Sequence, residues 1–266
     1  MSEKQDEEIP DNSDLNRTDI ASIHVLLETF INVARKIIEE VSETDSLEIR
    51  TILNYQEVLI MTEIEARKTG TTTLGLICRD AVIVAADRKA TMGYLVESKE
   101  ERKVFPLDNH IAMTIAGGVG DAQTLIRMLK AQFKLYKLER GPITLKAAST
   151  LLANVLQGNK YFPYYVQLIL AGYDSEPRVY SVDMAGGVGG YDKYYSTGSG
   201  SPFVYGVLES AYKENMSVED AIALAVKSIK AAVQRDIASG GNGMIVAVID
   251  KNGYRELSAQ ELKEYM

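Results

Sequence analysis

Histidine and cysteine, the side chains that most often serve as base and nucleophile, are scarce in this sequence. It contains two histidines, His24 and His110, and a single cysteine, Cys78. His110 lies in a polar turn before an apolar run, which favours a surface loop histidine over the base of a Ser-His-Asp triad. Cys78 ends an apolar run with no helix N-terminus evident beside it, which favours core packing over a reactive thiolate. We therefore expect neither a conventional nucleophile and histidine pair nor a Cys/His metal site.

A glycine-rich segment offers a second kind of chemistry. Residues 117–121, Gly-Gly-Val-Gly-Asp, lie between a predicted strand and a predicted helix, where backbone amides can hold a phosphate. The segment lacks the Lys-Ser/Thr ending of a Walker loop and the full spacing of a dinucleotide-binding loop. A tight strand-to-helix turn would contain the same residues, so the phosphate interpretation is weakly supported.

A third candidate is the threonine run at residues 71–73, which follows Gly70. Taken alone, this run is only the glycine-bounded start of a strand. Its chemical meaning depends on the elements around it and on the motifs that follow it along the chain.

Charge divides the chain near residue 70. Residues 1–70 contain sixteen acidic and seven basic residues, whereas residues 71–266 contain twenty-one and twenty-two. The first fifteen or so residues are polar and acidic, which predicts a disordered tail. Apolar residues recur at helical spacing over residues 20–41, and residues 47–64 form a second apolar segment that fits a helix or a strand. We interpret residues 1–70 as an N-terminal extension without a catalytic role.

Residues 71–266 alternate between groups of strands and pairs of helices. The predicted strands are residues 71–78, 81–86, 111–116, 166–173, 178–183, 194–197 and 244–250. The predicted helices are residues 121–138, 144–156, 202–213 and 218–234, with a short helix from Ser258. Segregated runs of this kind are typical of an α+β domain in which helix pairs cover the outer faces of packed sheets.

Composition excludes several classes of protein. The chain is 46% hydrophobic and 25% charged, as in ordinary globular proteins. Its longest apolar stretches fall well short of the roughly 20 residues that a membrane helix needs, and its acidic start differs from a secretory signal. The net charge of −8 argues against general nucleic-acid binding. We expect a cytoplasmic protein with no cofactor, no metal and no membrane or nucleic-acid partner.

Five groups of residues after Gly70-Thr71-Thr72-Thr73 give the threonine run its meaning. They are residues 85–91 (Ala-Ala-Asp-Arg-Lys-Ala-Thr), 102–103 (Arg-Lys), 115–122 (Ile-Ala-Gly-Gly-Val-Gly-Asp-Ala), 196–201 (Ser-Thr-Gly-Ser-Gly-Ser) and 235–241 (Arg-Asp-Ile-Ala-Ser-Gly-Gly). Together these ordered motifs resemble the proteasome β subunits, most closely the archaeal ones, over essentially all of residues 71–257. The resemblance implies a four-layer αββα sandwich of the N-terminal-nucleophile hydrolase type. It also implies a threonine endopeptidase made as a zymogen that removes residues 1–70 autocatalytically, leaving 71–266 as the catalytic domain.

The resemblance assigns roles to individual residues. Thr71 matches the nucleophile, and cleavage between Gly70 and Thr71 would free its α-amine, whose ordinary pKa of about 7.7–8.0 suits a base near neutral pH. Lys103 matches the catalytic lysine and Asp87 the aspartate paired with it. The remaining matches are Ser199, Asp236 and Ser239, which orient the amine and a water, and Gly117, whose N–H is the oxyanion donor.

Substrate recognition is implied at four further positions. Thr91 and Val119 match backbone positions that pair with an extended peptide. Ala90, Ile115 and Val119 match the lining of the pocket for the residue before the cleaved bond. These three side chains are apolar, so the resemblance predicts cleavage after hydrophobic residues.

The partners implied are those of a core particle. They are other β subunits in a seven-membered ring, α-subunit rings, an ATP-dependent unfoldase acting through the α ring, and unfolded polypeptides as substrates. Two alternatives stay open: an inactive β-type ring subunit, and a bacterial-type ATP-dependent threonine peptidase without α rings. The complete set of Thr71, Asp87 and Lys103 argues against the first, and the motifs at residues 196–201 and 235–241 against the second. The extension is longer than is usual in the archaeal family, and its role is left undecided.

Overall fold

The computed structural model of the chain describes residues 32, 70–93 and 95–266. The acidic tail, the helix predicted at residues 20–41 and the apolar segment at residues 47–64 fall outside the described residues, apart from residue 32. No helix among the described residues is long and apolar enough to cross a membrane.

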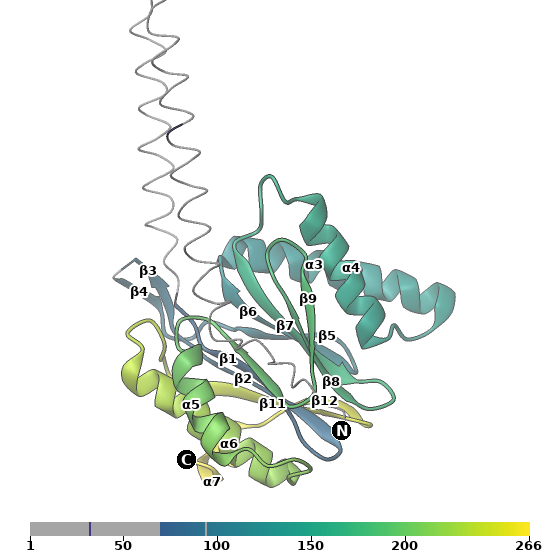
Figure 1. Cartoon of the computed structure of the whole chain (residues 1–266). Coiled ribbons are helices and arrows are strands. Elements are labelled where there is room, and N and C mark those ends of the chain that lie inside the picture. Colours follow the sequence, from purple (N-terminus) through teal and green to yellow (C-terminus); the bar gives the residue numbers. More distant parts are fainter. Residues whose placement is uncertain (1–31, 33–69, 94) are drawn as a thin grey trace, which may run out of the picture. The chain divides into compact units, whose positions relative to one another are not determined.

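Two antiparallel sheets of five strands each, with a small hairpin, make up the β structure (Figure 1). The first sheet has the strand order β10 (Tyr194–Thr197), β1 (Thr73–Ile77), β2 (Ala81–Asp87), β11 (Met244–Asp250) and β12 (Gly253–Glu256). The second has the order β5 (Val104–Asp108), β6 (Ile111–Gly117), β7 (Val166–Tyr173), β8 (Pro177–Val182) and β9 (Val188–Tyr191). The hairpin pairs β3 (Ala90–Met92) with β4 (Leu95–Ser98).

The helices pair on the outer faces of the sheets. α3 (Val119–Arg140) and α4 (Leu145–Gly158) pack on the second sheet, whereas α5 (Ser201–Ala211) and α6 (Val218–Arg235) pack on the first (Figure 1). A short helix, α7 (Ala259–Glu264), begins at a capping box formed by Ser258 and Glu261. α4 and α6 also begin at side-chain caps, from Thr144 and Ser217.

The apolar run of strand β2 lies at the centre of the first sheet and is covered on both faces. All seven of its residues are buried. Ala81, Ile83 and Ala85 face the helices α5 and α6, and Val82 and Val84 join the core that contains residues of both sheets. A strand covered on both faces needs apolar residues at every position instead of an alternating pattern.

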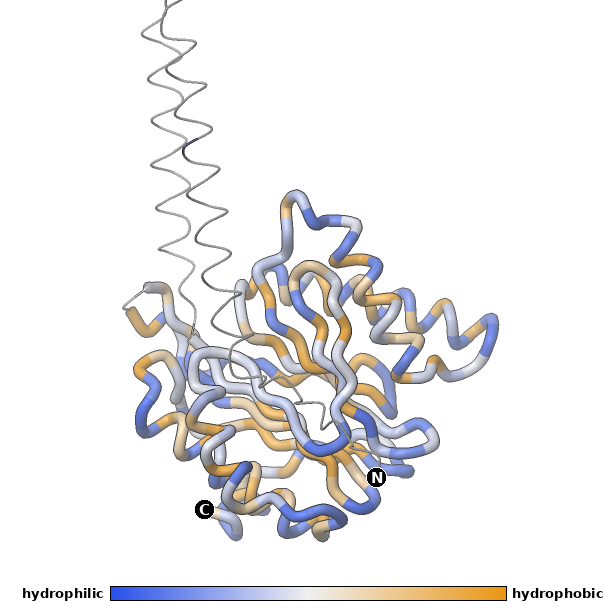
Figure 2. Tube along the Cα trace, viewed as in Figure 1, coloured by the Kyte–Doolittle hydropathy of each residue, from blue (hydrophilic) through white to orange (hydrophobic). Residues whose placement is uncertain are grey.

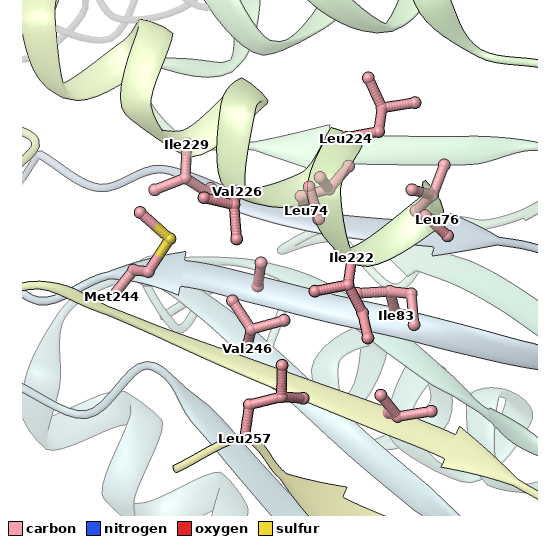
Figure 3. Packing of buried hydrophobic residues seen from close by; sticks show 14 of the residues in the cluster. Leu74, Leu76, Ile83, Ile222, Leu224, Val226, Ile229, Met244, Val246 and Leu257 are labelled. Atoms are coloured by element: carbon pink, nitrogen blue, oxygen red, sulfur yellow. The ribbon is translucent and has the colours of Figure 1, made fainter. Parts of the chain in front are cut away.

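The core under α6 consists mainly of aliphatic side chains. Ile222, Val226 and Ile229 of the helix lie over Leu74 and Ile83 of the strands (Figure 3). Over the described residues, the strands are mainly hydrophobic and the connections between elements mainly hydrophilic (Figure 2). The apolar spacing that predicted these helices is therefore the spacing of their buried faces.

Two leucines on α3 provide a matched test of this packing. Leu129 is 0% exposed within the second core, and Leu138 on the same helix is 77% exposed. We expect Leu129→Ala to lower the free energy of unfolding by about 2–5 kcal/mol, because it leaves a cavity. Leu138→Ala should change it by no more than about 0.5 kcal/mol. Urea unfolding of the isolated chain measures both, and equal losses would contradict the packing described.

The sequence predictions for regular structure are confirmed for the main elements. Every strand and helix predicted between residues 71 and 266 is present, most within one or two residues of the predicted ends. Strands β3, β4, β5, β9 and β12 were not predicted. The observed class is α+β with antiparallel sheets.

Candidate active site

The proposed cleavage point lies just before β1, which is an inner strand of the first sheet. Because β1 and β2 are antiparallel and Thr73 pairs with Ala86, the start of β1 lies beside the end of β2, where Asp87 is located. The Thr71 hydroxyl donates a hydrogen bond of 2.7 Å to the carbonyl oxygen of Gly70. The hydroxyl of the candidate nucleophile thus already touches the peptide group that it would attack.

Asp87 and Lys103 form a buried ion pair beside this bond. Lys103 Nζ lies 2.8 Å from Asp87 Oδ1, and the two residues are 5% and 0% exposed. The Asp87 carboxylate also accepts backbone N–H bonds from Thr72 at 2.9 Å, Gly240 at 2.8 Å and Lys89 at 3.1 Å. Together with Lys103, these three donors hold the buried carboxylate in one orientation.

The ammonium of Lys103 points toward the carbonyl oxygen of Gly70. Besides Asp87, it donates to the carbonyl oxygen of Lys89 at 2.5 Å and approaches that of Gly70 at 3.5 Å. Burial lowers the pKa of Lys103 below that of an exposed lysine, although the charge and hydrogen bond of Asp87 oppose the shift. The group can therefore stabilise negative charge near Thr71 and gives up its proton more readily than a surface lysine does.

A chain of hydroxyls and one carboxylate lies around the Thr71 nitrogen. Thr71 N donates to Ser199 Oγ at 3.3 Å, and Ser199 Oγ donates to Asp236 at 2.7 Å. Ser239 Oγ donates to the same Asp236 oxygen at 2.5 Å and lies 2.6 Å from Thr72 Oγ1. Since Ser199 directs its proton to Asp236, its lone pair is available to the Thr71 nitrogen.

Two glycines near Thr71 have a positive φ and no room for a side chain. At Gly198, with φ of 90°, a side chain would overlap the carbonyl oxygen of Thr71. At Gly117, with φ of 133°, it would overlap the carbonyl oxygen of Tyr165, and Gly117 lines the cleft beside Thr71. Both positions require glycine because of backbone conformation and space.

The cleft beside Thr71 brings together all four residues matched to substrate binding, namely Ala90, Thr91, Ile115 and Val119. Its other lining residues are Gly70, Glu97, Glu101, Arg102, Lys103, Phe105, Gly117, Ala122 and Gln123. Arg102 pairs with Glu256, and Lys103 pairs with Asp87. Within the described part of the chain, neither Glu97 nor Glu101 has an ion-pair partner. The predicted pocket was apolar, whereas the observed cleft also contains two carboxylates, those of Glu97 and Glu101.

Comparison of the sequence with known proteins identifies the family of the chain. The model of the proteasome subunit family matches residues 67–249. The chain is 49% identical to proteasome subunit beta of Picrophilus torridus over 199 residues, which are 74% of this chain and 94% of that protein. It is 48% identical to proteasome subunit beta of Methanocaldococcus vulcanius, over 74% of this chain and 89% of that protein. It is 44% identical to proteasome subunit beta 2 of Pyrococcus furiosus, over 77% of this chain and the whole of that protein.

The chain belongs to the proteasome subunit family. The resemblance to archaeal proteasome β subunits is thereby confirmed. Within this proteasome subunit, every residue assigned by the resemblance lies either in the network around Thr71 or in the adjoining cleft. Residues from five separate motifs, up to 168 positions from Thr71 at Ser239, converge there.

Four further residues of this proteasome subunit contact the site residues and were not predicted to do so. The amide N–H of Gly240 donates to Asp87, and the carbonyl oxygen of Lys89 accepts from Lys103. Thr72 forms hydrogen bonds with both Asp87 and Ser239. Ala238 packs directly against Gly70. All four residues lie inside or beside the sequence motifs on which the resemblance rests, and this position is the signal that could have identified them.

The groups set aside in the sequence occupy other positions. His110 is only partly exposed, and its Nε2 lies 2.8 Å from the carbonyl oxygen of Ile143, so it belongs to a packed turn more than to the surface. Cys78 is buried in the first core, and burial raises the pKa of its thiol. The glycine segment is a turn in which Gly118 N donates to Tyr165 O and Asp121 accepts from Tyr165 N.

Proposed function

We propose that this chain is the precursor of a catalytic proteasome β subunit, a threonine-type endopeptidase that hydrolyses unfolded proteins through Thr71. The observation that carries the proposal is the contact of the Thr71 hydroxyl with the Gly70 carbonyl, beside a buried lysine and aspartate pair. An inactive ring subunit would have no need of a buried charge pair at this bond, because such pairs are costly to desolvate.

Activation begins with the Gly70-Thr71 peptide bond. The Thr71 Oγ attacks the Gly70 carbonyl carbon, an Oγ–C ester bond forms, and the C–N bond breaks as the nitrogen gains a proton. Water then hydrolyses the ester, which leaves the Gly70 carboxylate on residues 1–70 and a free amine on Thr71. Holding the two groups in contact replaces a bimolecular encounter with an intramolecular step.

The mature site uses the new amine as its base. Ser199 and Asp236 orient the amine through the hydrogen bonds that now hold the amide, and Ser239 extends the same network. The Lys103 ammonium favours the ionised hydroxyl, and the Gly117 N–H stabilises the oxyanion of the tetrahedral intermediate. Thr91 and Val119 pair with the extended substrate backbone.

Fold and assembly follow the same proposal. The sheets and helix pairs form the four-layer αββα sandwich of the N-terminal-nucleophile hydrolases, with residues 71–266 as the catalytic domain and 1–70 as the propeptide. The mature subunit occupies a seven-membered β ring between α rings, and an ATP-dependent unfoldase supplies polypeptide through the α ring.

Assembly with α subunits should determine activity. We expect the isolated chain to be a poor peptidase and to gain at least about tenfold in kcat/KM when α-type rings are supplied. A tenfold gain requires the rings to lower the activation free energy by only about 1.4 kcal/mol, which ordering of the site residues can provide. Fluorogenic peptide hydrolysis across fractions from size-exclusion chromatography measures this. Full activity in a fraction shown to be monomeric would contradict the dependence on rings, and activity of a β-only ring would favour the bacterial-type alternative.

The same assay tests the preference for the residue before the cleaved bond. Peptides with a hydrophobic residue there should be cleaved best, since Ala90, Ile115 and Val119 line the cleft. Peptides with an acidic residue should be cleaved worst, because Glu97 and Glu101 repel a third carboxylate. A preference for acidic residues would contradict the assignment of the cleft.

A further inference from the structure

Gly70 lies against Ala238 with no room for a side chain. A Cβ atom placed on Gly70 would lie 2.7 Å from Cα and 3.0 Å from the carbonyl carbon of Ala238, and closer still to its Cβ. Real Cβ atoms do not approach other carbon atoms so closely. The two residues are separated by most of the domain in sequence, so this contact is a product of the fold.

Neither partner can retreat without breaking part of the site. On one side, the Ala238 N–H donates to Asp236 Oδ1 at 3.3 Å. The next residue, Ser239, donates its hydroxyl to Asp236, and Gly240 N donates to Asp87 at 2.8 Å. The loop that carries Ala238 is therefore tied to both carboxylates of the site.

On the other side, Gly70 is held at both of its backbone polar groups. Its N–H donates to Thr91 Oγ1 at 3.0 Å, and its carbonyl oxygen accepts from the Thr71 hydroxyl at 2.7 Å and lies 3.5 Å from Lys103 Nζ. A residue pushed away from Ala238 would carry its carbonyl out of the position in which Thr71 can attack it.

We propose that Ala238 is a specificity-determining residue of the processing step, whose methyl group admits only glycine at the position before Thr71. The proposal rests on the self-processing proposed above and adds the group that enforces its sequence requirement. It differs from an explanation by backbone freedom, in which glycine would be needed for its conformation alone.

The test is a rescue experiment on the full-length chain assembled with α rings. Gly70→Ala should slow the appearance of a chain beginning at Thr71 by about 100-fold, the loss expected for a displacement near 1 Å. Gly70→Ala with Ala238→Gly should recover to within about tenfold of the wild-type rate, since the second change removes the obstructing methyl group. Intact mass measured over time after assembly follows the reaction.

A matched second-site control separates space from general loop flexibility. Ala185 is an exposed alanine in the turn between β8 and β9 and is not one of the residues assigned to the site. Gly70→Ala with Ala185→Gly should remain as slow as Gly70→Ala alone. Ala238→Gly by itself should process its natural Gly70, which shows that the loop still folds.

The outcomes separate this inference from the proposed function. Processing of Gly70→Ala at the wild-type rate, or failure of Ala238→Gly to restore it while the wild type matures through Thr71, would overturn the role of Ala238 only. If maturation of the wild type did not depend on Thr71, self-processing itself would be lost, and the role of Ala238 with it.

Discussion

Thr71→Ala should leave residues 1–70 attached to every copy of the chain in assembled particles that contain no other active subunit. The substitution removes the hydroxyl that lies 2.7 Å from the Gly70 carbonyl oxygen, which is the attacking group of the proposed processing step. Peptidase activity should be absent too, because the nitrogen of residue 71 stays an amide with no basic lone pair. Intact mass and fluorogenic peptide hydrolysis on the same particles measure the two losses.

Thr71→Ser is the matched control for this experiment. It keeps the hydroxyl and should retain processing, although more slowly, because serine lacks the β-branch that restricts χ1 and holds the Oγ in the attacking position. If the alanine variant alone still matured to a chain beginning at residue 71, an outside protease would be responsible and self-processing would be ruled out.

Lys103→Ala should lower peptide hydrolysis by about 10³-fold, the scale of removing a group that stabilises developing charge at a reacting oxygen. The chain should be supplied with Thr71 already exposed, by replacing the leader with one that an unrelated protease removes, because the same lysine contacts Gly70 in the precursor. The quantity to compare is kcat/KM of assembled particles with that of the wild type. Turnover near the wild-type value would rule out the catalytic role.

This variant also carries a cost in stability that a surface salt bridge would not. Lys103 and Asp87 are both buried, and removing one partner of such a pair typically costs about 3–5 kcal/mol. The three backbone N–H bonds to Asp87 should reduce that loss. Lys146→Ala, which removes an exposed lysine from α4, is the control for loss of a positive charge. It should change neither stability nor turnover.

The elements predicted from the sequence are those with a strong apolar pattern. β2 and β7 are covered on both faces, and α6 has one continuous buried face, so each gives a clear signal. The strands that were not predicted lack such a pattern. β4 is largely exposed, β9 consists of Val-Gly-Gly-Tyr, and β5 contains a proline and an irregular register at Pro106.

The site could not be predicted from pattern in the same way. Asp87, Ser199 and Asp236 are short polar residues at the ends of strands or helices, where ordinary turn and capping chemistry uses the same types. Only the resemblance linked them to Thr71. The acidic residues of the cleft and the packing of Ala238 on Gly70 depend on contacts between distant segments, which a single sequence does not reveal.

The N-terminus of the chain in active particles tests the central claim most directly. Particles assembled from the full-length chain and α rings should be separated, assayed for peptide hydrolysis and weighed by intact mass spectrometry. We expect the β chain of active particles to begin at Thr71, with residues 1–70 lost. Active particles in which the chain still carried residues 1–70, or began at any other residue, would contradict a mechanism that depends on the free amine of Thr71.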